Sequence, residues 1–182
     1  MGWRRARDRA LNVSRLVAWL VAIVWFAWAA ALDTQARTAL EASPWLPDVG
    51  VALFVAWAVR IEARHLMMLA CLAALSRASF SVEPPVSIFA AYVAAALFIG
   101  IGRQSFDLSR PLARAFVAAV VTALWMSWSW VVLLARHGEG TAPTWGALFA
   151  GALWTGLAAL FFGGWFARLP GIGALGKRSF AK

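Results

Sequence analysis

Three apolar runs separated by very short polar turns constrain the fold of this chain more than any other feature. The runs cover residues 49–59, 66–75 and 86–101. The first two are too short to cross a bilayer alone, because a transmembrane helix needs about 20 mostly apolar residues. Extended over their flanks to residues 43–60 and 61–80, both reach that length, with the charges at their ends where long side chains reach the membrane surface. The stretch predicts a tight helical hairpin followed by a third span.

The composition places the chain in a membrane. Of its 182 residues 63% are hydrophobic and 14% are charged, whereas a soluble domain is roughly half apolar and about 25% charged. The net charge of +9 would suit nucleic acid, but the basic residues lie in short segments that flank apolar runs. That arrangement orients a membrane protein, so we expect contact with membrane lipids and no contact with nucleic acid. The single cysteine excludes an intrachain disulfide.

Six apolar segments divide the chain. Besides the three above, they cover residues 16–32, 115–134 and 144–167. The predicted fold class is therefore an all-α integral membrane protein with six spans. Its organisation is a basic cytoplasmic tail (1–15), a six-span membrane domain (16–167) and a second basic cytoplasmic tail (168–182), with a polar connector at 33–47. A cleaved signal peptide is the alternative for the first segment, because a basic start and an apolar run precede Ala29-Ala30-Ala31.

Lysine and arginine predict the orientation. In a six-span arrangement 14 of these residues lie on the side of both termini and 3 lie on the other side. Cytoplasmic loops carry the excess of positive charge, so we expect a multi-pass protein of the bacterial inner membrane with both termini cytoplasmic. A re-entrant pair at residues 43–80 would leave the same charges on the same sides, and charge alone leaves both arrangements open.

The sequence shows no reactive constellation. All eight acidic residues lie at or outside the ends of the predicted spans, and neither HExxH nor GxSxG occurs. His65 and His137 stand at span boundaries without a partner at metal-ligand spacing. Membrane enzymes and proton-coupled pumps need ionisable groups inside the bilayer. We therefore predict a protein that is not an enzyme, with no catalytic, cofactor-binding or metal-binding residues.

Three polar residues in the hairpin region are candidates for contact with a partner: Asp48, Arg77 and Glu83. Asp48 follows Pro47 at the start of a predicted helix, where a carboxylate either caps the helix or faces a partner. Arg77 lies at the far end of the hairpin. Its alternatives are a partner contact, snorkelling toward the surface, or a local pair with Glu83.

Small residues recur at four-residue spacing in two segments. In the last span Gly146 precedes Ala150 and Ala147 precedes Gly151, and residues 90–95 repeat the pattern with alanines. Such faces let helices approach closely in lipid, so Gly146 and Gly151 are further candidates for partner contact. An alanine-rich coding bias produces the same spacings.

The order of these elements resembles the rod-shape-determining MreD family over nearly the whole chain. The resemblance rests on the basic start, one span, a connector, and Pro47-Asp48 opening the helix VGVALFVAWAV. It continues through the turn RIEAR, the helix LMMLACLAALS, the segment SIFAAYVAAALFIGI with Tyr92, and the closing span GALFAGALWTGLAALFF.

The resemblance implies a non-catalytic inner-membrane scaffold of the cell-elongation complex, which makes peptidoglycan and sets cell shape. Its partners would be MreC-like and RodA-like proteins together with a class B penicillin-binding protein. The implied fold is that of the substrate-binding subunits of energy-coupling-factor transporters. Two other functions stay open: a carrier for a small, vitamin-like molecule, and an accessory subunit of another membrane complex. Pairing with a second copy of the chain also stays open.

Overall fold

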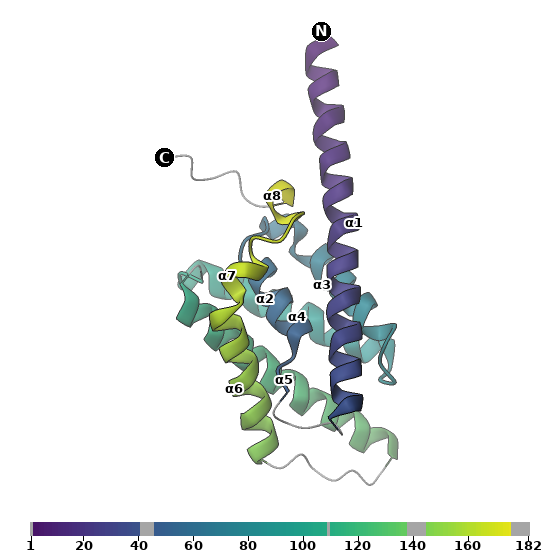
Figure 1. Cartoon of the computed structure of the whole chain (residues 1–182), viewed down its shortest axis with the longest axis vertical. Coiled ribbons are helices and arrows are strands. Elements are labelled where there is room, and N and C mark those ends of the chain that lie inside the picture. Colours follow the sequence, from purple (N-terminus) through teal and green to yellow (C-terminus); the bar gives the residue numbers. More distant parts are fainter. Residues whose placement is uncertain (1, 41–45, 109, 138–144, 176–182) are drawn as a thin grey trace.

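The computed structural model describes residues 2–40, 46–108, 110–137 and 145–175 (Figure 1). Eight helices and no strand occur within these ranges, which confirms the predicted all-α class. The helices are α1 (Gly2–Ala39), α2 (Val49–Ala58), α3 (Ala63–Ala78), α4 (Pro85–Ser105), α5 (Pro111–His137), α6 (Trp145–Phe161), α7 (Gly163–Phe166) and α8 (Ile172–Leu175).

Helix α1 is longer than the first predicted span. It has 38 residues, or about 57 Å at 1.5 Å per residue, against a hydrocarbon core of about 30 Å. No proline or glycine occurs between residues 3 and 43, so nothing in the sequence stops the helix. The predicted tail and the first part of the predicted connector are thus helical and continuous with the first predicted span. Residues 2–15 begin α1, and Asp33 lies inside the same helix.

The predicted hairpin is present, but its two helices are shorter than the predicted spans. Helix α2 has only 10 residues, about 15 Å, which is half of a bilayer. It begins after Pro47 and ends before the charged turn at Arg60, and nine of its ten residues are buried. Helix α3 has 16 residues and carries charges at both ends. A helix that is apolar all round is a core helix, and α2 is the centre of this molecule.

Three helices are long and apolar enough to cross a membrane by themselves. The segments are Ser14–Ala39 in α1, Pro85–Gln104 in α4 and Pro111–Arg136 in α5. Helix α6 is shorter, with 17 residues, and α7 follows it after Phe162. The six-span count therefore remains a prediction. Its boundaries at residues 43–45, the turn after His137 and residues 176–182 of the basic tail lie outside the described residues.

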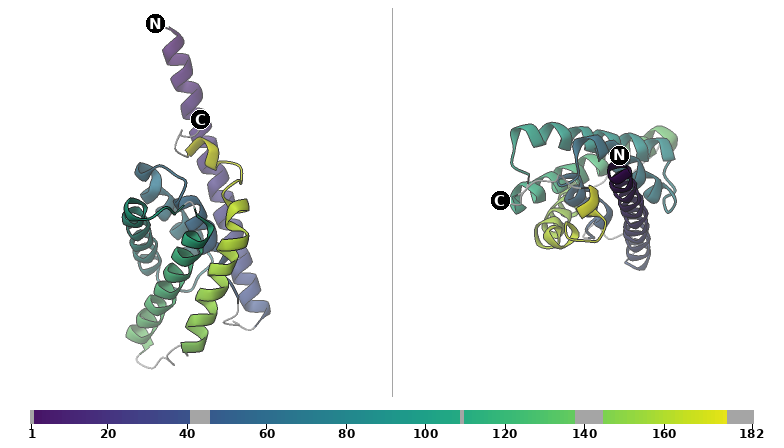
Figure 2. Two further views of the ribbon diagram at one scale, coloured as in Figure 1. Left: turned by 90° about the vertical axis from the view of Figure 1, so that its left-hand side faces the viewer. Right: turned by 90° about the horizontal axis from the view of Figure 1, so that it is seen from above.

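The remaining helices surround α2. Helix α6 packs closely on α5, because a Cβ added to Gly156 would lie 3.1 Å from the carbonyl oxygen of Ala115. Helix α4 runs at a steep angle to α1, as the side view and the view from above both show (Figure 2). Aromatic contacts join the layers, with Tyr92 lying 5.2 Å from both Phe54 and Trp125 between ring centres. Helix α2 is therefore buried, is about half as long as a bilayer is thick, and has its first turn deep in the protein.

Candidate functional site

The start of α2 is the most polar point of the core. Asp48 is the N-cap residue, and its Oδ1 accepts a hydrogen bond of 2.8 Å from the Val51 N–H. Its own N–H donates to Thr155 Oγ1 at 2.9 Å, and the Thr155 hydroxyl donates to the Gly151 carbonyl. Of the alternatives that the sequence left open for Asp48, helix capping is thus confirmed. The hydroxyl of Thr155 joins α2 to α6.

A second carboxylate reaches the same helix start from α1. Asp33 Oδ1 accepts from the Val49 N–H at 3.1 Å, and its Oδ2 accepts from the Gly50 N–H at 3.4 Å. The first N–H groups of a helix have no partner inside the helix, and its N-terminus carries partial positive charge. Two buried carboxylates suit this position. Asp33 carries no local signal of this role, because in the sequence it stands at the start of a polar connector.

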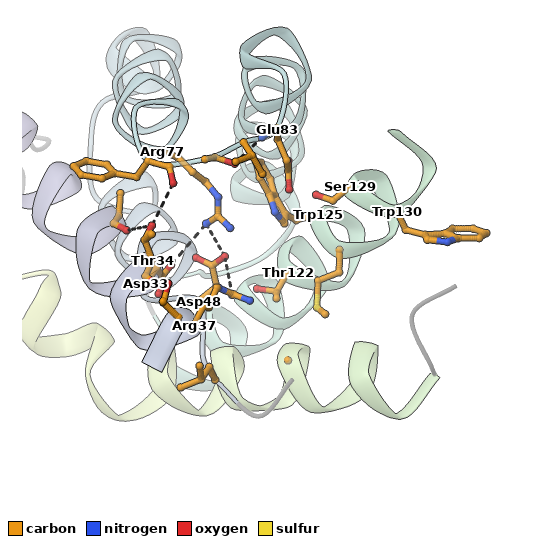
Figure 3. A pocket seen from close by; sticks show the side chains of 18 of the residues that line it. Asp33, Thr34, Arg37, Asp48, Arg77, Glu83, Thr122, Trp125, Ser129 and Trp130 are labelled. Atoms are coloured by element: carbon orange, nitrogen blue, oxygen red, sulfur yellow. Dashed lines mark hydrogen bonds and ion pairs between the residues drawn. The ribbon is translucent and has the colours of Figure 1, made fainter. Parts of the chain in front are cut away.

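Arg77 crosses from the last turn of α3 to these carboxylates (Figure 3). Its Nη1 lies 2.7 Å from Asp48 Oδ2 and 3.7 Å from Asp33 Oδ2. The guanidinium carbon also lies 4.5 Å from the ring centre of Trp125, within the range of a cation–π contact. The local pair with Glu83 that the sequence allowed is absent from the ion pairs of the described residues.

Hairpin geometry explains why Arg77 meets Asp48. Helices α2 and α3 run in opposite directions from the turn at Arg60, and the two residues lie at the ends of these helices that are far from that turn. Arg37, one turn beyond Asp33 on α1, completes the group with its Nη2 3.9 Å from Asp48 Oδ2. Two carboxylates and two guanidiniums, contributed by α1, α3 and the start of α2, form what we term the charged cluster: Asp33, Arg37, Asp48 and Arg77.

A cavity of about 690 Å³ opens beside the charged cluster. Its lining comes from α1, the start of α2, the α3–α4 loop, α5 and α6. Its polar lining residues are Asp33, Thr34, Arg37, Thr38, Asp48, Arg77, Ser81, Glu83, Thr122 and Ser129. Of the five residues predicted to face a partner, four therefore converge on one cavity: Asp48, Arg77, Glu83 and Gly151. Gly146 does not line it and is exposed on α6.

Several polar atoms around this cavity have no hydrogen-bond partner within the part of the chain that the structure describes. They are Glu83 Oε2, Thr122 Oγ1, Ser129 Oγ and Trp130 Nε1. Buried polar groups are normally hydrogen-bonded, and each exception needs an explanation. The sequence offered no signal for Thr122 or Ser129, because hydroxyls in an apolar helix commonly bond to the carbonyl one turn before.

A second hollow is apolar and lies between α4 and α5. It has a volume of about 430 Å³. Its lining consists of Ala90, Ala91, Ala94, Ala95, Phe98, Val121, Leu124, Trp125 and Trp128. We term it the alanine groove. The other small-residue face is buried inside the protein, where Gly156 of α6 packs on α5. The two faces with the same sequence pattern therefore have different surroundings.

The chemistry of the site is that of charge pairing and hydrogen bonding at a helix start. No group of three His, Cys, Asp or Glu side chains that could hold a metal ion occurs among the described residues. The four charged side chains of the cluster form ion pairs with one another, and the two carboxylates accept hydrogen bonds from the first N–H groups of α2. Comparison of the chain with protein-family models, curated proteins and solved structures gives no match.

Proposed function

We propose that this protein is a non-catalytic scaffold of the MreD type in the bacterial inner membrane. It would support elongation-type peptidoglycan synthesis by holding MreC-like and RodA-like membrane proteins together. The order of the segments along the chain motivates this assignment, and the alanine groove is the structural observation that carries it. The two termini would both be cytoplasmic.

The alanine groove suits a transmembrane helix of a partner. Ala90 and Ala94 are exposed on α4, and the rim residues Phe98, Leu124 and Trp128 are 42–58% exposed. Helices associate in lipid by close packing of small residues, because lipid tails are as apolar as the helix surface and give no hydrophobic gain. We assign the groove to the membrane span of an MreC-like protein. A single helix can lie along it without disturbing the core.

The charged cluster supports a scaffold role in a different way. Ionisable groups inside a membrane protein often mark transport or catalysis. Here Arg77 bridges both aspartates, and both aspartates accept N–H groups from α2. These charges hold α1, α2 and α3 in one arrangement. A rigid body with fixed outer faces is what a scaffold needs.

The test is to change the groove without changing the core. Ala94→Leu fills the groove, and Ala135→Leu makes the same change at an exposed position of α5 outside it. We expect Ala94→Leu to lower co-purification of the MreC-like protein and to round the cells while membrane levels stay normal. Ala135→Leu should behave as wild type. Equal co-purification in both variants, or unchanged cell shape after depletion of the protein, would refute the scaffold.

The cavity beside the charged cluster favours a second function, that of a carrier for a small molecule. Ligand pockets commonly have volumes of about 300–1,000 Å³ and a few convergent polar groups, and this cavity has both properties. A small molecule that stays bound through purification, together with unchanged cell shape on depletion, would favour the carrier over the scaffold.

A further inference from the structure

We propose that the cavity beside the charged cluster binds a small protonated amine that also carries oxygen atoms able to form hydrogen bonds. This inference does not rest on the scaffold function. It rests on the polar atoms in the cavity wall that the protein leaves without partners.

Glu83 supplies the negative charge for such a ligand. It lies in the loop between α3 and α4, one residue before the proline that caps α4. Its Oε2 is buried without a hydrogen-bond partner, and Glu83 forms no ion pair within the described residues. A carboxylate oxygen removed from water without compensation is costly. A bound cation at this position would offset that cost.

The other charges of the cavity are already matched. Asp48 is bonded to Arg77 and lies near Arg37, and Asp33 accepts two backbone N–H groups and faces Arg77. Glu83 is the one carboxylate of this lining that has neither an ion pair nor a hydrogen bond to its buried oxygen within the described residues. An unmatched carboxylate selects a cation over an anion.

Two hydroxyls on α5 decide what kind of cation fits. Thr122 is 2% exposed, its Oγ1 has no partner, and it points from α5 toward Asp48 (Figure 3). Ser129 also has an unpartnered Oγ and lies opposite Glu83 in the same view. The two residues are two helical turns apart, about 10 Å along α5. A hydroxyl either accepts from an ammonium N–H or donates to a ligand oxygen.

The ligand therefore needs both an N–H-bearing ammonium and oxygen atoms. A quaternary ammonium has no N–H and would leave Glu83 and Ser129 without hydrogen bonds. A neutral sugar would leave the Glu83 charge unmatched. Trp125 and Phe80 add aromatic surface to the lining, which favours a cation further. Amino sugars and amino alcohols combine these features at a size that the cavity volume admits.

The test compares matched probes on the purified full-length protein in detergent. Glucosamine and glucose differ only in the amine, and tetramethylammonium is a cation without N–H groups. Binding is followed by calorimetry and by the fluorescence of the tryptophans in the lining, up to concentrations on the order of 10 mM. We expect glucosamine and ethanolamine to bind, and glucose and tetramethylammonium not to bind. Equal binding of glucose or of tetramethylammonium, or no binding of any probe, would overturn the proposal.

Variants identify the site. Glu83→Gln should weaken glucosamine binding about tenfold or more, because a hydrogen bond to a charged group is lost. Thr122→Val, which keeps the side-chain shape, should weaken it several-fold. Glu62→Gln removes the same charge from a carboxylate that pairs with Arg64 and does not line the cavity, and it should bind as wild type. Equal binding by Glu83→Gln and wild type would overturn the assignment, provided that both melt at the same temperature.

The ammonium group has two sources in a membrane, a free amine or the headgroup of phosphatidylethanolamine. Nanodiscs of phosphatidylcholine, with and without phosphatidylethanolamine, separate them. If phosphatidylethanolamine lowers glucosamine binding by the wild type, the headgroup is the ligand. If glucosamine binds equally in both nanodiscs, the ligand is a free amine. The scaffold is tested by partner capture in cells, so either proposal can fail without the other.

Discussion

At the scale of single residues, Asp48 links four helices at the start of α2. It caps α2, pairs with Arg77 from α3, lies near Arg37 from α1 and holds Thr155 of α6 through its backbone N–H. Its side chain is 3% exposed and that of Arg77 is 18% exposed. Removing one member of a buried pair leaves an uncompensated charge, which costs far more than the pair gains.

We therefore expect Asp48→Ala and Arg77→Ala each to lower the free energy of unfolding by about 3–5 kcal/mol. The double variant should lose clearly less than the sum, because neither member of the Asp48–Arg77 pair then remains without the other, with a coupling of about 1–3 kcal/mol. Unfolding in a denaturing detergent measures the stability of the wild type, of the two single variants and of the double variant. The sequence alone allowed a loss of about 1 kcal/mol or less for capping and snorkelling residues, so the size of the effect distinguishes the two views.

The control cycle uses Glu62 and Arg64, which also form an ion pair. Arg64 is 60% exposed, and exposed pairs contribute only about 0–1 kcal/mol. A coupling in the Asp48–Arg77 cycle no larger than in this control would show that the buried pair does not hold the helices together.

At the scale of elements, the joint between α6 and α7 shows how close packing fixes a helix end. Arg114 of α5 is 5% exposed, and its Nε donates to the Ala159 carbonyl of α6 at 3.2 Å. Gly163 begins α7 directly against this guanidinium, where an added Cβ would lie 2.5 Å from Arg114 Nε. Gly164, the next residue, has open space around its Cα. The arginine can bond to α6 only because residue 163 has no side chain.

Gly163→Ala should therefore destabilise the protein by about 1–3 kcal/mol, since the new methyl group displaces a buried, hydrogen-bonded guanidinium. Gly164→Ala should change the stability by no more than about 0.5 kcal/mol. Thermal unfolding of the two variants side by side checks both values. Equal melting temperatures for the two variants would mean that Arg114 moves freely and that the α5–α6–α7 joint is loose.

At the scale of the whole molecule, the number of membrane crossings depends on the shorter helices. Three helices suffice by length, and α6 together with α7 covers residues 145–166, about 33 Å if continuous. The short α2 and α3 form a hairpin whose turn lies at Arg60. Such a pair either crosses twice with the help of its flanks or enters and leaves on one side. If α6 also crosses, the number of crossings is even in both cases. The C-terminus then lies on the same side of the membrane as the N-terminus.

We expect a reporter fused after Lys182 to be cytoplasmic, as the excess of Lys and Arg on that side predicts. Fusions after Arg37 and Glu83 should report the outer side, and a fusion after Asp107 the cytoplasm. If only the three long helices cross, the C-terminal reporter will be external. A mature protein that lacks about the first 31 residues would instead support the signal-peptide alternative.

The sequence by itself determined that the chain belongs in a membrane and that its fold is helical. Exposing long apolar runs to water is unfavourable, so runs with charges only at their ends belong in lipid. In lipid the backbone must form its hydrogen bonds within helices. It also offered helix capping as one of two roles for Asp48, because proline followed by aspartate before an apolar run is a local signal. Local patterns sufficed wherever the deciding interactions join residues close in the chain.

Only the tertiary structure decided which residues meet. Asp33 and Arg77 come to α2 from other helices, and a change in helix length of a few residues rotates such side chains to another face. The paired glycines 163 and 164 read alike in sequence, yet only Gly163 faces a guanidinium. Likewise, the small residues of α4 line a groove, while Ala150, Gly151 and Gly156 of α6 are buried. In each case the deciding contact joins segments far apart in the chain, and no local pattern encodes that contact.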